Sequence, residues 1–193
     1  MRSVSRSFTR FMFHISYNMA SLTWTLLSEE PLHLGWRRLV RRTYRYPDGR
    51  EGVWEIKEEP RIVTVFCLTP RQNVVLVRQF RPGPGEEILD MPGGCVEPGE
   101  DPAAAAAREL LEETGYEGQV TPVAVALCDA YSTMVRYVYA VTQARPVRDP
   151  ETDDSEFIEA VELPLAEFRA HLRAAHMTDV EAGYLALDHL NLL

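Results

Sequence analysis

One helix-forming stretch near the middle of the chain constrains its fold and chemistry most. Asp101 is a good N-cap residue, and Pro102 suits the first helical position. Residues 103–107 are all alanine, the strongest helix former, and Gly115 suits the left-handed conformation that ends many helices. The sequence therefore predicts a helix from residue 102 to residue 114.

Three carboxylates share one side of this predicted helix. Glu109 and Glu113 are four residues apart, and Glu112 is three residues from Glu109. At about 5 Å and an effective dielectric of about 20, two such charges repel by roughly 3 kcal/mol, and they lie at the negative end of the helix dipole. Mg²⁺ relieves such repulsion because it prefers carboxylate oxygens. The spacing therefore makes these residues candidate metal ligands, Glu112 directly or through water, with an exposed acidic face as the alternative.

The residues before the helix decide between a metal site and an exposed acidic face. Gly94 is followed after five residues by Glu100 and, after seven more, by the run Arg-Glu-Leu-Leu-Glu-Glu-Thr-Gly-Tyr, which starts at Arg108. This stretch resembles the Nudix box and matches it at every defined position. The resemblance implies a Nudix hydrolase with an α+β fold (an α/β/α sandwich) around a mixed sheet. It also implies a loop–helix–loop whose glutamates hold Mg²⁺, or Mn²⁺ in its place, against a diphosphate.

The resemblance also implies a role for each residue of the box. The Gly93 carbonyl is expected to join the metal ligands, and Glu112 and Glu113 are expected to be catalytic as well as metal-binding. Arg108 is expected to orient the glutamates rather than to contact substrate. The expected structural members of the box are Gly94, Glu100, Arg108 and Gly115.

Motifs outside the box resemble the ADP-ribose pyrophosphatase branch of the family. They lie at residues 78–82, at Glu87, at residues 91–100, at residues 156–158 and at residues 177–179. The branch implies a nucleoside diphosphate sugar as substrate, with a nucleoside monophosphate and a sugar phosphate as products. It also implies a general base in the acidic loop that contains Asp153. There we expect Asp154 to be the base and Glu156 to be an extra metal ligand.

One segment departs from that branch. Residues 128–134 lack the Pro and Gly of its Ser-Pro-Gly-like turn, which loosens the fit to ADP-ribose itself. Dinucleoside polyphosphates, coenzyme A, nucleoside triphosphates and RNA caps therefore stay open as substrates, and Tyr131 is weak evidence for a polyphosphate. A non-catalytic Nudix-fold ligand sensor is a further alternative. The intact glutamates argue against a sensor.

The N-terminal third is expected to serve assembly and substrate binding. Residues 1–18 are expected to be a disordered extension, a targeting arm or a gene start placed too early. Residues 19–60 are expected to form a β arm that pairs two copies in a homodimer. Residues 61–193 then form the hydrolase domain. Arg81 and Arg42 are candidate phosphate contacts because a guanidinium binds phosphate oxygens in pairs. Trp36 is a candidate for stacking on a base.

Composition narrows the remaining classes. The net charge of −9 argues against general nucleic-acid binding, and 46% hydrophobic residues suffice for a core. Three scattered cysteines support neither a disulfide framework nor a zinc site. No Gly-Lys-Ser/Thr phosphate loop occurs, and no apolar run reaches the about 18 residues that a transmembrane helix needs. We expect a cytoplasmic enzyme that acts on a small nucleotide substrate, without nucleic-acid or membrane partners.

Turn residues, β-branched apolar runs and helical periodicity predict the other elements. The expected strands span residues 35–46, 51–58, 61–68, 73–80, 87–91, 119–128, 135–143 and 157–163, and the expected helices residues 164–175 and 178–190.

Overall fold

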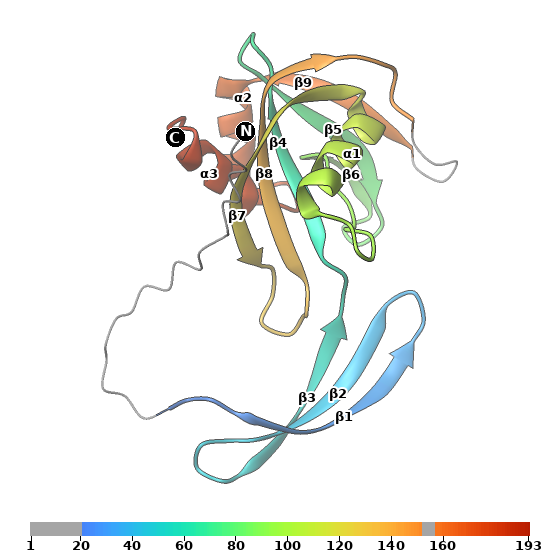
Figure 1. Cartoon of the computed structure of the whole chain (residues 1–193), viewed down its shortest axis with the longest axis vertical. Coiled ribbons are helices and arrows are strands. Elements are labelled where there is room, and N and C mark those ends of the chain that lie inside the picture. The colour runs from blue at the N-terminus through green and yellow to red at the C-terminus, as the bar shows by residue number, and fades with distance from the viewer. Residues whose placement is uncertain (1–20, 152–156) are drawn as a thin grey trace, which may run out of the picture.

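The computed structural model describes residues 21–151 and 157–193. In chain order the elements are β1 (Thr25–Leu34), β2 (Arg38–Arg45), β3 (Glu51–Glu58), β4 (Ile62–Leu68), β5 (Asn73–Arg81), β6 (Glu86–Asp90), α1 (Pro102–Thr114), β7 (Tyr116–Leu127), β8 (Val135–Pro146), β9 (Ile158–Pro164), α2 (Leu165–Ala174) and α3 (Val180–His189). Figure 1 shows that β1–β3 form a separate arm, and that β3 leads into β4 of a larger domain.

The larger domain has three layers around a mixed sheet. The strand order is β6-β5-β4-β8-β7, β9 pairs with β5, and β4 and β8 are parallel. Side chains of β4 alternate between two apolar clusters, so that Val63 and Val65 pack with α1 while Phe66 and Leu68 pack with α2 and α3. This arrangement confirms the expected α/β/α sandwich.

The sheet divides at β5. One edge of β5 pairs with β9 along residues 73–79. The other edge of β5 pairs with β4 at Val74 and Val75, and further along with β6. The edge of β4 that β5 leaves is taken by the segment that precedes α1. Val63 N donates to Gly94 O at 2.9 Å, and Val65 N donates to Pro92 O at 2.8 Å. The loop that opens the box is therefore attached to a central strand.

The strands and helices predicted from the sequence are present, with ends that move by a few residues. Strand β1 was not predicted from the sequence. It pairs with β2 and makes β2 the central strand of the arm. Every residue of β1 is exposed in the single chain, and its middle consists of Glu29, Glu30 and Pro31, which are residue types depleted in strands. The expected extension at residues 1–18 lies outside the described residues. Across the described residues, no helix combines the length and the apolar character needed to cross a bilayer.

Candidate active site

Helix α1 begins and ends as its sequence predicts. The Asp101 side chain accepts a hydrogen bond from Ala103 N at 2.7 Å, and Gly115 adopts the left-handed conformation at φ 73°. Ala105 and Ala106 are fully buried, and their small side chains let the helix approach the sheet closely. The last two turns carry the acidic residues of the box.

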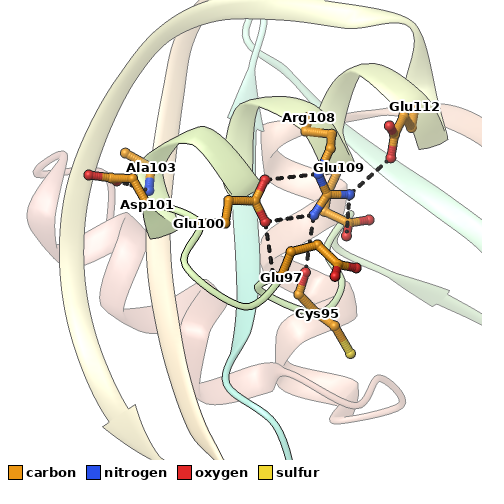
Figure 2. Close-up of polar contacts among 8 residues, drawn as sticks. All are labelled: Cys95, Glu97, Glu100, Asp101, Ala103, Arg108, Glu109 and Glu112. Carbon is orange, nitrogen blue, oxygen red and sulfur yellow. Dashed lines mark hydrogen bonds and ion pairs between the residues drawn. The ribbon is translucent and has the colours of Figure 1, made fainter.

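Arg108 is the centre of the polar network on α1, as Figure 2 shows. Its guanidinium donates to both carboxylate oxygens of Glu100, at 3.0 and 3.1 Å. It also donates to Glu109 at 2.9 Å, to Glu112 at 3.1 Å and to the Cys95 carbonyl at 3.1 Å. The hydrogen bond with Glu100 is the largest influence on Arg108, and it holds the pKa of Arg108 above its ordinary value. Arg108 thus offsets the repulsion between the carboxylates and ties the helix to the loop before it.

Two carboxylates of α1 meet the glycine pair at residues 93 and 94. Glu113 is buried and accepts a hydrogen bond from Gly93 N at 2.8 Å. A side chain on Gly94 would overlap the carboxylate of Glu109. The missing side chain at residue 94 is therefore what allows Glu109 to lie against this turn.

The donor chemistry of this cradle fits a hard divalent cation. Carboxylate and carbonyl oxygens are the protein ligands of Mg²⁺ and Ca²⁺, and Glu109 and Glu113 lie beside the Gly93 peptide. Glu112 is turned to Arg108 instead. Within residues 21–151 and 157–193, no three His, Cys, Asp or Glu side chains converge as a metal site in this conformation. Two of the three expected glutamates are thus gathered at the glycine turn.

The expected general base Asp154 and the expected metal ligand Glu156 lie outside the described residues, as does Asp153. The segment that leads to them is described, and it lies against the end of α1. Glu151 N donates to the Glu112 carbonyl at 2.9 Å, and Val147 N donates to Gly115 O at 2.9 Å. Val147 and Glu151 thus lie at the same end of α1 that carries the glutamates.

The arm residues expected to bind substrate are not packed against the box in the single chain. Trp36 lies between β1 and β2 and is 95% exposed. Arg42 is paired with Glu29 of β1 at 2.5 Å. Arg37, in the turn between β1 and β2, pairs with Glu59, between β3 and β4, at 3.0 Å. Burial raises the pKa of the Cys95 thiol, and Arg37 opposes that shift.

The segment that departs from the family branch is docked on β3. Lys57 N donates to Tyr131 O at 2.8 Å, and Thr133 N donates to Lys57 O at 2.9 Å. The rings of Trp54 and Tyr131 are stacked with centroids 5.8 Å apart, and the Lys57 ammonium pairs with Asp129 at 2.6 Å. A loop with a turn at Ala130 and Tyr131, attached to β3 of the arm, thus stands where the branch has its Pro-Gly turn.

Comparison with known proteins identifies the family. Residues 58–181 match the family model of the NUDIX domain. The protein belongs to the Nudix hydrolase family. This Nudix protein is 37% identical to the ADP-sugar pyrophosphatase of Mus musculus over 190 aligned residues, which cover 85% of this chain and 87% of the mouse protein.

Two other comparisons support the same placement. The ADP-ribose pyrophosphatase of Bacillus subtilis is 28% identical, over 76% of this Nudix chain and 80% of the bacterial protein. The crystal structure of an ADP compounds hydrolase has a TM-score of 0.74 and 21% identity, and the match covers 91% of this chain and 100% of that one. At that identity the match shows a shared fold.

Sequence reasoning missed one buried residue of this Nudix hydrolase. Asp90, at the end of β6, is fully buried and pairs with Arg81, a candidate substrate contact, at 2.7 Å. Its other carboxylate oxygen accepts a hydrogen bond from Thr178 N at 2.7 Å. The only signal in the sequence is a carboxylate that ends an apolar strand just before Met-Pro-Gly-Gly. Nothing local indicates its partners.

Proposed function

We propose that this Nudix hydrolase cleaves the diphosphate of ADP-ribose and related nucleoside diphosphate sugars. The products are a nucleoside monophosphate and a sugar phosphate. The contact of Glu113 and Glu109 with the turn at Gly93 and Gly94 carries the catalytic part of the proposal. The match to an ADP-sugar pyrophosphatase over 85% of the chain supports the substrate class.

We assign the metal site to Glu109, Glu113 and the Gly93 carbonyl, with Glu112 joining directly or through water. A divalent cation held by these residues would supply positive charge against the diphosphate and would make a water molecule more acidic. Arg108 holds Glu109 and Glu112 in place through the hydrogen bonds of Figure 2. Asp154 is assigned as the base that deprotonates the attacking water, and Glu156 as a further ligand. The attachment of Glu151 to the end of α1 supports both assignments.

We propose that the arm, within residues 19–60, forms a homodimer and that residues 61–193 form the hydrolase domain. Several large apolar side chains of the arm are exposed in the single chain, and gathered apolar surface of this kind is typical of a protein–protein interface. They are Leu22, Trp24, Leu26, Leu27, Leu32, Leu34, Trp36 and Val53. A second copy would cover them and could bring Trp36 and Arg42 to the partner's substrate. A fully active monomer by light scattering at micromolar concentration would contradict this proposal.

A substrate panel tests the function directly. Purified protein is incubated with Mg²⁺ and with ADP-ribose, other nucleoside diphosphate sugars, dinucleoside polyphosphates, coenzyme A and nucleoside triphosphates. We expect AMP and ribose 5-phosphate from ADP-ribose, and water labelled with heavy oxygen identifies the attacked phosphorus. Release of inorganic diphosphate from nucleoside triphosphates, with ADP-ribose untouched, would reject the substrate proposal and leave the family unchanged.

The expected cytoplasmic location stays a prediction. A non-catalytic sensor would bind ADP-ribose without turnover in this panel, which separates that alternative from an enzyme.

A further inference from the structure

Asp90 connects three parts of the molecule that are far apart in sequence. Its Oδ2 accepts a hydrogen bond from Arg81 Nε at 2.7 Å, and its Oδ1 accepts one from Thr178 N at 2.7 Å. Asp90 is fully buried, so neither bond competes with bulk water. One carboxylate thus joins the end of β5 to the residues that open α3.

The segment after Asp90 leads from this contact to the proposed metal turn. Asp179, which follows Thr178, is buried at the N-cap of α3. Met91 is followed by Pro92 and Gly93, whose N–H meets Glu113. The start of α3 therefore fixes the strand end from which the proposed metal turn departs.

The way Asp90 holds Arg81 matters for binding. The contact uses only Nε, and the two Nη groups of Arg81 form no hydrogen bond with a described residue. The Arg81 side chain is 34% exposed, so its outer edge reaches solvent. A guanidinium anchored by Nε keeps its Nη pair available for two oxygens of one phosphate.

We propose that Asp90 is a positioning residue, which anchors Arg81 through Nε so that both Nη groups face the diphosphate of the substrate. The inference rests on the proposed function and adds to it a specific dependence of substrate binding on a buried carboxylate. A preoriented guanidinium loses less side-chain freedom on binding, and Asp90 supplies that orientation. Asp90 itself touches no substrate.

A double-mutant cycle tests this role. The variants are Asp90→Asn, Arg81→Gln and the double variant, and the readouts are KM and kcat for ADP-ribose with Mg²⁺ and its Kd in EDTA. Each single change should raise KM and Kd by at least about tenfold, the range for losing a hydrogen bond to a charged group. The change in kcat should be smaller. Because Asp90 acts through Arg81, the double variant should lose no more than Arg81→Gln alone.

Arg81→Lys is the second test, and it leaves Asp90 intact. Lysine keeps the charge but has one ammonium, which cannot hold Asp90 and two phosphate oxygens together. We expect it to lose nearly as much affinity as Arg81→Gln. Arg173→Gln, a change of an exposed arginine of α2, is the matched control and should leave KM and Kd unchanged. Melting temperatures show which variants are folded.

The outcomes separate this inference from the proposed function. Additive losses in the double variant, or a wild-type KM in Arg81→Lys, would overturn the positioning role even if ADP-ribose is turned over normally. If the wild type binds ADP-ribose without hydrolysing it, and the Kd of the double variant equals that of Arg81→Gln, only the proposed activity is rejected. Wild-type protein that neither binds nor cleaves ADP-ribose would reject both.

Discussion

The carboxylate of Glu109 fills the space that a side chain on residue 94 would need. Because the clash is with the far end of a flexible side chain, Gly94→Ala should displace the carboxylate rather than the backbone. We expect stability to change by less than about 1 kcal/mol and Mg²⁺ affinity to fall by about tenfold or more, as a metal ligand is misplaced. Isothermal titration with Mg²⁺ and thermal melting measure the two effects.

Gly83→Ala is the matched control for that substitution. A Cβ at residue 83 meets nothing within 4 Å, so metal affinity and stability should both stay at wild-type values. Unchanged Mg²⁺ affinity in Gly94→Ala would show that Glu109 does not hold the metal from its described position.

Glu113→Gln should separate catalysis from folding. Glutamine keeps a side-chain oxygen for the 2.8 Å bond from Gly93 N, but it removes the charge that we assign to the metal. We expect kcat to fall by at least about 10²-fold, the range for losing one electrostatic stabiliser, with little change in melting temperature. Glu167→Gln, on the exposed first turn of α2, is the control. Near-normal turnover in Glu113→Gln would rule out the metal assignment.

Trp36→Ala tests the arm. Trp36 is 95% exposed in the single chain, so its loss should cost the fold less than about 0.5 kcal/mol. If it stacks on the base of a substrate bound by the partner, KM should rise by roughly 5- to 100-fold, because such stacking contributes about 1–3 kcal/mol. Leu127→Ala, at another exposed apolar residue, is the control. Equal KM values for both variants and the wild type would remove Trp36 from the site.

Asp179 should make stability depend on pH. Burial raises its pKa to about 7 from the ordinary value of 3.8, the nearby charge of Asp90 adds to that shift, and Arg136 opposes it. The folded state therefore binds more protons than the unfolded state between these two values, so stability falls as pH rises through that window. The loss is absent below the unfolded pKa and complete above the folded one.

Asp179→Asn removes this loss. Asparagine has nearly the same shape and carries no charge at any of these pH values. Its stability relative to the wild type should increase by about 1–4 kcal/mol from about pH 5 to about pH 8, since one pKa unit corresponds to about 1.4 kcal/mol. Urea unfolding at a series of pH values measures the difference. Parallel stability curves for the two proteins would contradict the expectation.

The predictable part of this molecule is the part that local sequence specifies. The cap at Asp101, the alanine run, the spacing of Glu109 and Glu113 and the stop at Gly115 act within a few residues of one another, and α1 forms as predicted. The resemblance to the Nudix box then predicts the fold of the larger domain. The central strands β4 and β5 followed from continuous β-branched, apolar runs, because both of their faces are buried.

Local sequence does not specify the other features. Asp90 and Thr178 are 88 residues apart, so their contact exists only once β6 and α3 pack together. The strand β1 has no buried face in the single chain, and it depends on pairing with β2. The docking of Tyr131 on β3 likewise joins residues that no short-range pattern relates. The roles of Asp154 and Glu156 remain predictions.

The division of the sheet at β5 links two buried amides to the candidate active site. Val63 N and Val65 N donate to carbonyls of Gly94 and Pro92 instead of to a neighbouring strand. The protection of these two amides from hydrogen exchange therefore reports how stably the loop at the start of the box is attached to β4. Binding of a metal ion at the Gly93 turn should therefore slow the exchange of these two core amides, which can be measured without a label at the site itself.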